Sequence, residues 1–128
     1  MTARRALAVA VAATCLSFTG CGLCANDVVS DVRSPDGTFH AVVFRRNCGA
    51  TTDFTFHVSV LLTNQSLSDG EGNIFMADSD RWLGPSMGIN VAWQGTRSLL
   101  VRFPASARIY HEYKPMGVIR VGYEKLTP

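Results

Sequence analysis

The chain has 128 residues, of which 12 are basic and 10 are acidic, so its formal net charge is +2. Two of the basic residues, Arg4 and Arg5, precede an apolar stretch at the N-terminus, and without them ten basic residues balance ten acidic ones. Because no basic cluster is larger than Arg45-Arg46, this balance excludes a surface that follows the phosphates of a nucleic acid.

The N-terminal segment has the order of features found in an export signal. Two arginines are followed by an uncharged run, residues 6–18, which is too short to span a bilayer as a helix. The run ends in the sequence FTGC at residues 18–21, which resembles the lipobox of bacterial lipoproteins. That resemblance implies a lipoprotein signal peptide over residues 1–20 and a lipid anchor on Cys21. The alternative is ordinary signal-peptidase cleavage near Ala25.

The mature chain, residues 21–128, is long enough for one domain and too short for two. Removing 20 residues from 128 leaves 108, which can enclose a single core, and no Pro/Ser-rich linker divides them. Lipoproteins of the inner membrane commonly carry Asp after the acylated cysteine, whereas this chain has Gly22. The resemblance to lipoproteins therefore implies a position on the outer membrane, facing the periplasm.

Three cysteines remain in the predicted mature chain. Cys21 carries the lipid, and in an oxidising compartment the other two, Cys24 and Cys48, most often form a disulfide. Only two residues would then lie between the anchor and the folded domain, a reach of about 10 Å. The prediction is a domain held close to the lipid surface.

Two alternative uses of these sulfurs stay open. The C-x-x-C pattern at residues 21–24 is found in thiol–disulfide exchange proteins, but no helix follows it to lower a thiol pKa. Cys48 could instead act as a nucleophile, with the backbone N–H of Gly49 as a donor and His40 or His57 as the base. No local pattern of a cysteine hydrolase surrounds it.

Turn residues and alternating apolar positions predict strands in the first half of the mature chain. Residues 27–33 form a first strand that ends at the sequence SPDG, a turn in which the glycine accepts a positive φ. Residues 38–46 form a second strand, apolar on both faces and therefore central. In residues 54–62 apolar and polar positions alternate, which predicts a strand with one buried face. A polar, exposed connection, residues 64–72, follows it.

The second half of the chain repeats this pattern with shorter elements. The predicted strands are residues 73–78, 89–94, 99–103, 107–113 and 118–125. The second and third of these form a hairpin with Trp93 inward, and the last two pair around the turn at residues 114–117. We therefore predict an all-β, or nearly all-β, domain: a compact antiparallel sheet or sandwich of six to eight strands.

Two loops carry the candidate binding residues. The loop of residues 47–53 begins beside the predicted disulfide and is rich in hydroxyl groups and backbone donors. We expect Thr51, Thr52 and Asp53 to form a contact surface, joined by Trp82 from a later loop. The alternative for Trp82 is a side chain that folds back over the core.

The sequence predicts no metal site and no cofactor. His40, His57 and His111 are far apart, and no Cys/His cluster has the spacing of metal ligands. Asp69 and Glu71 stand at alternate positions, as in a calcium loop, but the bidentate glutamate of such a loop is absent. A solvated loop is the better interpretation.

Several segments together resemble a family of small bacterial lipoproteins and secreted proteins of uncharacterised activity. The family combines an early cysteine, SPDG before an aromatic residue and Ala-Val-Val, the sequence CGATT, an alternating strand and a late Val-x-Trp hairpin. In this chain they are Cys24 and residues 34–43, 48–52, 54–62 and 91–101. The resemblance implies a Cys24–Cys48 disulfide and a common fold, and it implies no activity.

These patterns favour a non-enzymatic role. The leading hypothesis is a membrane-anchored lipoprotein whose domain binds another protein or component of the cell envelope. One alternative is a thiol-dependent hydrolase that uses Cys48. Another is a structural protein that takes part in envelope assembly through an exposed sheet edge.

Overall fold

The computed structural model describes residues 24–49, 54–79, 83–112 and 117–127. These residues form eight strands and no helix, which confirms the predicted all-β class. The strands are β1 (Ala25–Arg33), β2 (Phe39–Asn47), β3 (Thr55–Leu62), β4 (Phe75–Asp78), β5 (Asn90–Trp93), β6 (Ser98–Pro104), β7 (Arg108–Glu112) and β8 (Arg120–Leu126).

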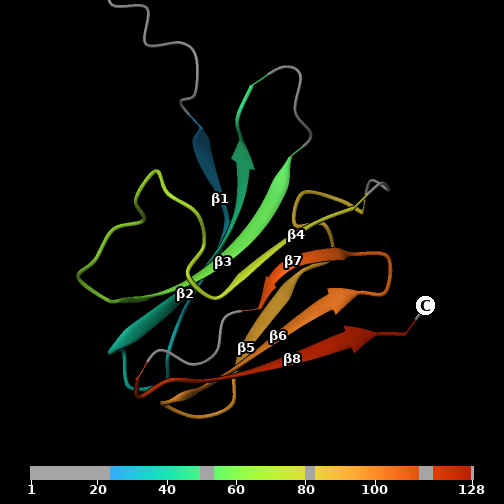
Figure 1. Cartoon of the computed structure of the whole chain (residues 1–128). Coiled ribbons are helices and arrows are strands. Elements are labelled where there is room, and N and C mark those ends of the chain that lie inside the picture. Colours follow the sequence, from blue (N-terminus) through green and yellow to red (C-terminus); the bar gives the residue numbers. More distant parts are fainter. Residues whose placement is uncertain (1–23, 50–53, 80–82, 113–116, 128) are drawn as a thin grey trace, which may run out of the picture.

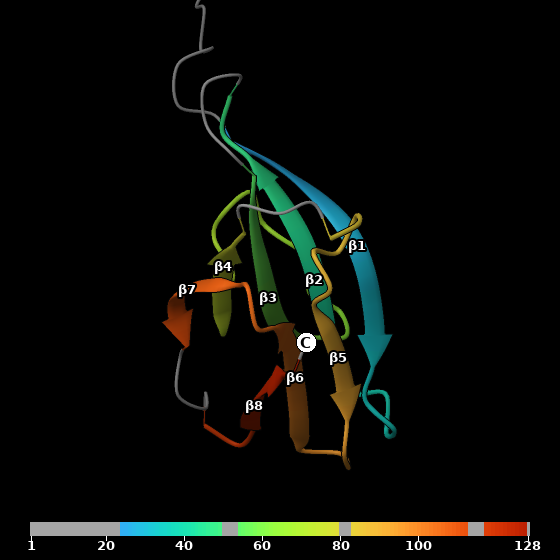
Figure 2. The same cartoon turned by 90° about the vertical axis from the view of Figure 1, so that its right-hand side faces the viewer.

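The strands form two sheets that pack as a sandwich. One sheet has five antiparallel strands in the order β1-β2-β3-β4-β7, and the other has three in the order β5-β6-β8. Figures 1 and 2 show β5, β6 and β8 together as a second layer beside the larger sheet. The buried apolar cluster takes residues such as Val43 and Val58 from one sheet and Leu99 and Val101 from the other. Each sheet thus buries one face against its partner.

β2 is an interior strand of the larger sheet with both faces covered, as its apolar run predicts, although the middle strand of the five is β3. Ala41, Val42, Val43 and Phe44 are all at most 1% exposed, so both faces of the strand are covered. β1 pairs with it on one side and β3 on the other. Fully burying a side chain of this kind contributes about 1.5–3 kcal/mol, so these residues form a stable centre for the sheet.

The turn between β1 and β2 has the predicted geometry. The N–H of Gly37 donates to the carbonyl oxygen of Ser34 over 2.9 Å, and Gly37 has a φ of 72°. Asp36 accepts hydrogen bonds from the Ser34 hydroxyl at 2.8 Å and from the backbone N–H of Thr38 at 3.1 Å. These bonds, that of Ser34 foremost, lower the pKa of Asp36. The first hairpin is therefore fixed by local chemistry.

The predicted pairing of the last two strands is wrong. β7 pairs with β4 in the larger sheet, whereas β8 pairs with β6 in the smaller one, and the β6–β8 pairing is parallel. Parallel neighbours need a long crossover connection, and residues 105–119, which include β7, provide it. The chain thus crosses to the other sheet and returns, so two strands adjacent in sequence end in different layers.

The predicted burial of β3 needs a correction. Phe56 and Val58 face the core as expected, but His57 and Ser59 on the opposite face are also buried, at 0% and 3% exposure. Phe54, expected inside, is 39% exposed. The middle of β3 therefore has both faces covered, although its sequence alternates like that of a half-buried strand.

β1 is an edge strand with an irregular register. Its pairing with β2 shifts between Val28 and Ser30, which indicates a β-bulge, and Val29 rather than Val28 packs against the core. The half-buried Trp93 of β5 packs there too, and its indole N–H donates to the carbonyl oxygen of Val32 over 2.8 Å. A bulge at an edge discourages pairing with another chain, and the indole ties the two sheets together.

Candidate functional site

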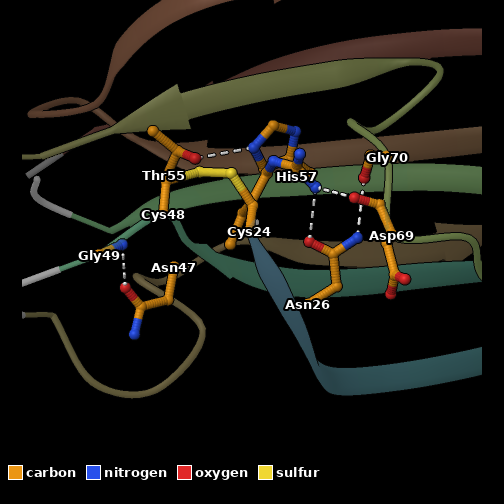
Figure 3. The surroundings of a disulfide bond; sticks show 10 residues. Cys24, Asn26, Asn47, Cys48, Gly49, Thr55, His57, Asp69 and Gly70 are labelled. Carbon is orange, nitrogen blue, oxygen red and sulfur yellow. Dashed lines mark hydrogen bonds between the residues drawn. A yellow bond between two sulfur atoms is a disulfide. The ribbon is translucent and has the colours of Figure 1, made fainter. Parts of the chain in front are cut away.

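The predicted disulfide between Cys24 and Cys48 is present. The two sulfur atoms are 2.02 Å apart, directly before β1 and directly after β2. Because Ala25 is paired with Asn47, the bond closes the open end of the first hairpin, opposite its turn. Figure 3 shows this bond beside Asn47 and Gly49, where the N–H of Gly49 donates to the side-chain oxygen of Asn47 over 3.0 Å.

Several predicted site residues lie outside the described residues. They are the export signal, residues 1–20, the predicted lipidation site Cys21, and the candidate contact residues Thr51, Thr52, Asp53 and Trp82. Their roles stay predictions. The described start of the contact loop, Cys48 and Gly49, is exposed and held by the disulfide.

The histidines proposed as bases for a Cys48 nucleophile have other partners. His40 is 2.8 Å from the Asp31 carboxylate through Nδ1 and 3.0 Å from the carbonyl oxygen of Gln65 through Nε2. Cys48 itself is bonded to Cys24. Since a thiolate and not a disulfide is the nucleophile, the hydrolase alternative requires the reduced protein.

His57 is a buried structural residue. Its Nδ1 accepts a hydrogen bond from the backbone N–H of Gly72 over 3.0 Å, which leaves the ring hydrogen on Nε2, 2.8 Å from the hydroxyl oxygen of Thr55. The ring is stacked on Phe44 with a centroid distance of 5.2 Å. Burial, and secondarily the charge of Arg46, lowers the pKa of His57 to about 4. The imidazole is therefore neutral at physiological pH.

The connection of residues 63–74, between β3 and β4, covers the outer face of the larger sheet. The side-chain amide of Asn26 donates to the carbonyl oxygens of Ser68 and Gly70, at 2.9 and 2.8 Å, and Arg46 donates to the carbonyl oxygen of Asp69. Six of the nine residues predicted as an exposed connection, residues 64–72, are exposed, but the connection is also docked on the sheet (Figure 1). It explains why His57, on the outer face, is buried.

Gly72 is the point of closest approach between this connection and the sheet. A Cβ atom at Gly72 would lie 2.7 Å from the carbonyl oxygen of Val58, 2.8 Å from Cβ of His57 and 2.9 Å from the carbonyl oxygen of Phe75. All three distances are shorter than real Cβ contacts, and the carbonyl oxygens belong to the backbone. Only glycine fits this position without moving a strand.

We expect the Gly72→Ala variant to lower the free energy of unfolding by about 1–3 kcal/mol, the usual range for overpacking. Chemical denaturation at pH 7 measures the change. Gly70→Ala is the matched control, because its Cβ would meet only the Ser68 hydroxyl, at 3.2 Å, which can rotate away. Equal effects of the two substitutions would contradict this account of Gly72.

An apolar pocket of about 280 Å³ lies between the two sheets at the turn end of β2. Its lining residues are Phe39, Val60, Leu62, Gln65, Ile74, Ile119 and Val121, of which only Gln65 is polar. Ile74 and Ile119, at 1% and 3% exposure, form the floor, and Leu62, at 43%, is at the rim. Since three strands face five, the smaller sheet leaves this part of the inner face open.

Two polar side chains lie beside this pocket. Gln65 lines it, and Arg97, which is not among the lining residues, lies over the lining residue Phe39, with its guanidinium carbon 4.9 Å from the ring centroid. The side-chain oxygen of Gln65 accepts from the backbone N–H of Leu62 over 3.0 Å, so the amide nitrogen of Gln65 keeps its two hydrogens for other acceptors. The mouth thus offers N–H donors above apolar walls.

A second, more polar hollow of about 350 Å³ lies beneath the docked connection. Its lining residues are Ser59, Leu61, Gln65, Ser66, Leu67, Ser68, Glu71 and Asn73. Asn73 there donates to the carbonyl oxygen of Val60 and accepts from its N–H, both at 2.8 Å, and so continues the sheet pairing through a side chain. These bonds give the hollow a structural role in docking the connection.

Asp78 forms a charged cluster with β7. Its carboxylate accepts hydrogen bonds from Nε of Arg108 at 2.7 Å and from the hydroxyl of Tyr110 at 2.7 Å. The side chain of Asp78 is 9% exposed, so a bidentate arginine and a phenol satisfy a nearly buried charge. The cluster fastens the edge strand β7 to β4.

Comparisons with known proteins do not identify the chain. No family model, no curated protein and no solved structure matches it. In the part of the chain that the structure describes, no group of three or more His, Cys, Asp or Glu residues could hold a metal ion. The same residues include no helix of sufficient length and hydrophobicity to cross a membrane.

Proposed function

We propose that this chain is an exported lipoprotein whose acylated Cys21 holds a non-enzymatic binding domain on the outer membrane, facing the periplasm. The observation that carries the proposal is the disulfide between Cys24 and Cys48. Structural disulfides form in oxidising compartments, which agrees with export. The same bond consumes the Cys48 sulfur that the hydrolase alternative needs.

The position of the disulfide supports a close attachment to the membrane. Three residue steps separate Cys21 from Cys24, a reach of about 10 Å. Since Cys24 is tied to the end of β2, the domain would be held by the open end of its first hairpin. The turn end of β2 would then point away from the bilayer, about 26 Å from the disulfide for eight steps along a strand.

A binding role is supported by the pocket at that far end. An apolar pocket with a few polar groups at its mouth is the usual form of a small-ligand site. The predicted contact residues Thr51, Thr52, Asp53 and Trp82 are proposed as a second site, for an envelope protein. An alanine scan of these four residues that leaves all captured partners unchanged would remove this second site.

The lipid anchor is tested by substituting the acylated residue. We expect the full chain, produced in bacteria, to enter the membrane fraction with the added mass of a lipid anchor, and the Cys21→Ser variant to lose both. Cys15→Ser is the control, because Cys15 lies in the predicted signal peptide and its loss should change neither. A wild-type chain without added mass would overturn the proposal.

A further inference from the structure

We propose that the apolar pocket at the turn end of β2 binds the alkyl chain of a free medium-chain carboxylate, and that Arg97 and the Gln65 amide hold the carboxylate at the mouth. This inference rests on the proposed function, since it names the ligand class of the binding domain. The walls, the volume, the charge at the mouth and the position in the domain each support it.

The walls suit an unbranched hydrocarbon chain. Six of the seven lining residues are apolar, and the floor reaches the core through Ile74 and Ile119. A polar or aromatic-amide ligand would leave its polar groups without partners at this depth, which is unfavourable. An alkyl chain has no such groups, so the depth of the pocket selects for it.

The volume limits the length of that chain. A methylene group occupies roughly the 30 Å³ that a water molecule does, so a pocket of about 280 Å³ holds about nine carbon atoms. That is one medium chain. A membrane phospholipid carries two longer chains, so the pocket fits a free amphiphile with a single chain.

The charge at the mouth selects the head group. The Arg97 side chain is 45% exposed, and its contact with Asp36 is a single one of 3.4 Å. Asp36 accepts further bonds from Ser34 and Thr38, so its carboxylate is shared among several donors. The guanidinium nitrogen of Arg97 that contacts Asp36 also donates to the carbonyl oxygen of Thr96 over 3.3 Å. The other two guanidinium nitrogens keep their hydrogens for an anion, and the carboxylate of a fatty acid fits their planar arrangement.

The position of the pocket agrees with a free ligand. Phe39 and Leu62, which line it, are paired at the ends of β2 and β3 that lie farthest from Cys48. Under the proposed attachment this end points away from the bilayer. The ligand would then arrive from the periplasm as a single molecule.

Equilibrium dialysis tests the inference on the full chain held in nanodiscs. Radiolabelled decanoate is the probe, and free concentrations are measured in the opposite chamber, so partition into the nanodisc lipid is subtracted with a blank of empty nanodiscs. The comparison protein is the Val60→Phe variant, whose larger side chain fills the pocket. We expect saturable binding of one decanoate by the wild type and at least a tenfold weaker affinity in the variant.

The dependence on chain length is the sharpest part of the test. Each methylene that enters an apolar site raises affinity about fourfold. We expect this increase from hexanoate to about decanoate and less than a twofold further gain for dodecanoate, because the pocket is then full. Affinity that keeps rising in proportion to chain length would show adsorption to an open surface and would overturn the inference.

The head group is tested with Arg97→Gln. We expect this substitution to weaken decanoate binding about threefold, the effect of an exposed ion pair, and to leave the binding of the neutral decanol unchanged. Equal losses for both ligands would remove the assigned role of Arg97.

Control variants separate pocket filling from misfolding. Val28→Phe makes the same change at a 56% exposed position on β1 and should bind like the wild type. If Val60→Phe does not fold, Val121→Phe fills the pocket from the opposite sheet. Undiminished decanoate binding in a folded pocket-filling variant would overturn the inference. So would a wild-type chain that binds no decanoate and forms a dimer, if the pocket-filling variant abolishes that dimer.

The anchor and the pocket can fail separately. Flotation of the protein with the nanodiscs reports attachment, whereas dialysis reports the ligand. Decanoate binding by a protein that does not float would support the pocket and overturn the anchor. A protein that floats with the nanodiscs but shows no saturable decanoate binding would support the anchor and overturn the pocket as a ligand site.

Discussion

Lowering the pH from 7 to 4 is expected to reduce the free energy of unfolding by about 3 kcal/mol through His57 alone. The pKa of His57 is lowered to about 4 in the folded protein, mainly by burial, against about 6.5 in the unfolded chain. Between these values the unfolded chain binds more protons. The contribution of His57 to the free energy of unfolding is therefore fully present above about pH 6.5 and is lost as the pH falls towards 4.

The structure explains why the folded protein resists this proton. Protonation would place a charge at a side chain that is 0% exposed and would remove the acceptor for the Gly72 N–H. The docked connection would then lose one of its attachments to the sheet. We therefore expect acid to loosen residues 63–74 before the core.

Urea unfolding of the wild type and His57→Asn at several pH values measures this effect. The asparagine oxygen can accept from Gly72 and does not titrate, so the gap in stability between the two proteins should shrink by about 3 kcal/mol from pH 7 to pH 4. A gap for His57→Asn that stays constant over this pH range would show that the ring of His57 does not resist protonation.

Removing the disulfide is expected to lower the free energy of unfolding by about 3 kcal/mol. Cys24 and Cys48 are 24 residues apart in sequence, and closing a loop of this length restricts the unfolded chain by about that amount. A domain of this size has a total stability of only about 5–15 kcal/mol. The loss is therefore a large part of what keeps the protein folded.

The Cys24→Ser/Cys48→Ser double variant tests this prediction by denaturant unfolding at pH 7. Dithiothreitol should destabilise the wild type to the level of the double variant and leave the variant unchanged. A reductant effect on the double variant, or none on the wild type, would contradict the assignment. Asn26 lies two residues from Cys24 and holds the docked connection, so faster hydrogen exchange in residues 68–70 should accompany the loss.

The candidate sites differ in how much of them the sequence could predict. The disulfide could be predicted from two cysteines and a predicted export signal, because pairing in an oxidising compartment needs little knowledge of the fold. The apolar pocket has no such pattern. Phe39, Gln65 and Arg97 are ordinary members of a strand, a connection and a turn, and only the packing of distant segments brings them together.

Three features of the chain could be found only from the tertiary structure. The burial of His57 depends on a connection that docks on the outer face, and the pocket depends on a smaller sheet that leaves part of a larger one open. The parallel pairing of β6 with β8 depends on where β7 finds a partner. Each is set by contacts between residues far apart in sequence.

The sequence by itself determined the all-β class and the first turn, and it predicted six to eight strands with approximately the observed limits. These follow from side-chain alternation and turn chemistry, which act between residues a few positions apart. The tertiary structure alone decided which strands pair, which strands have both faces buried and where a cavity remains. Such choices depend on the shape and area of whole sheets, because each sheet must bury its apolar face against whatever surface the rest of the chain provides.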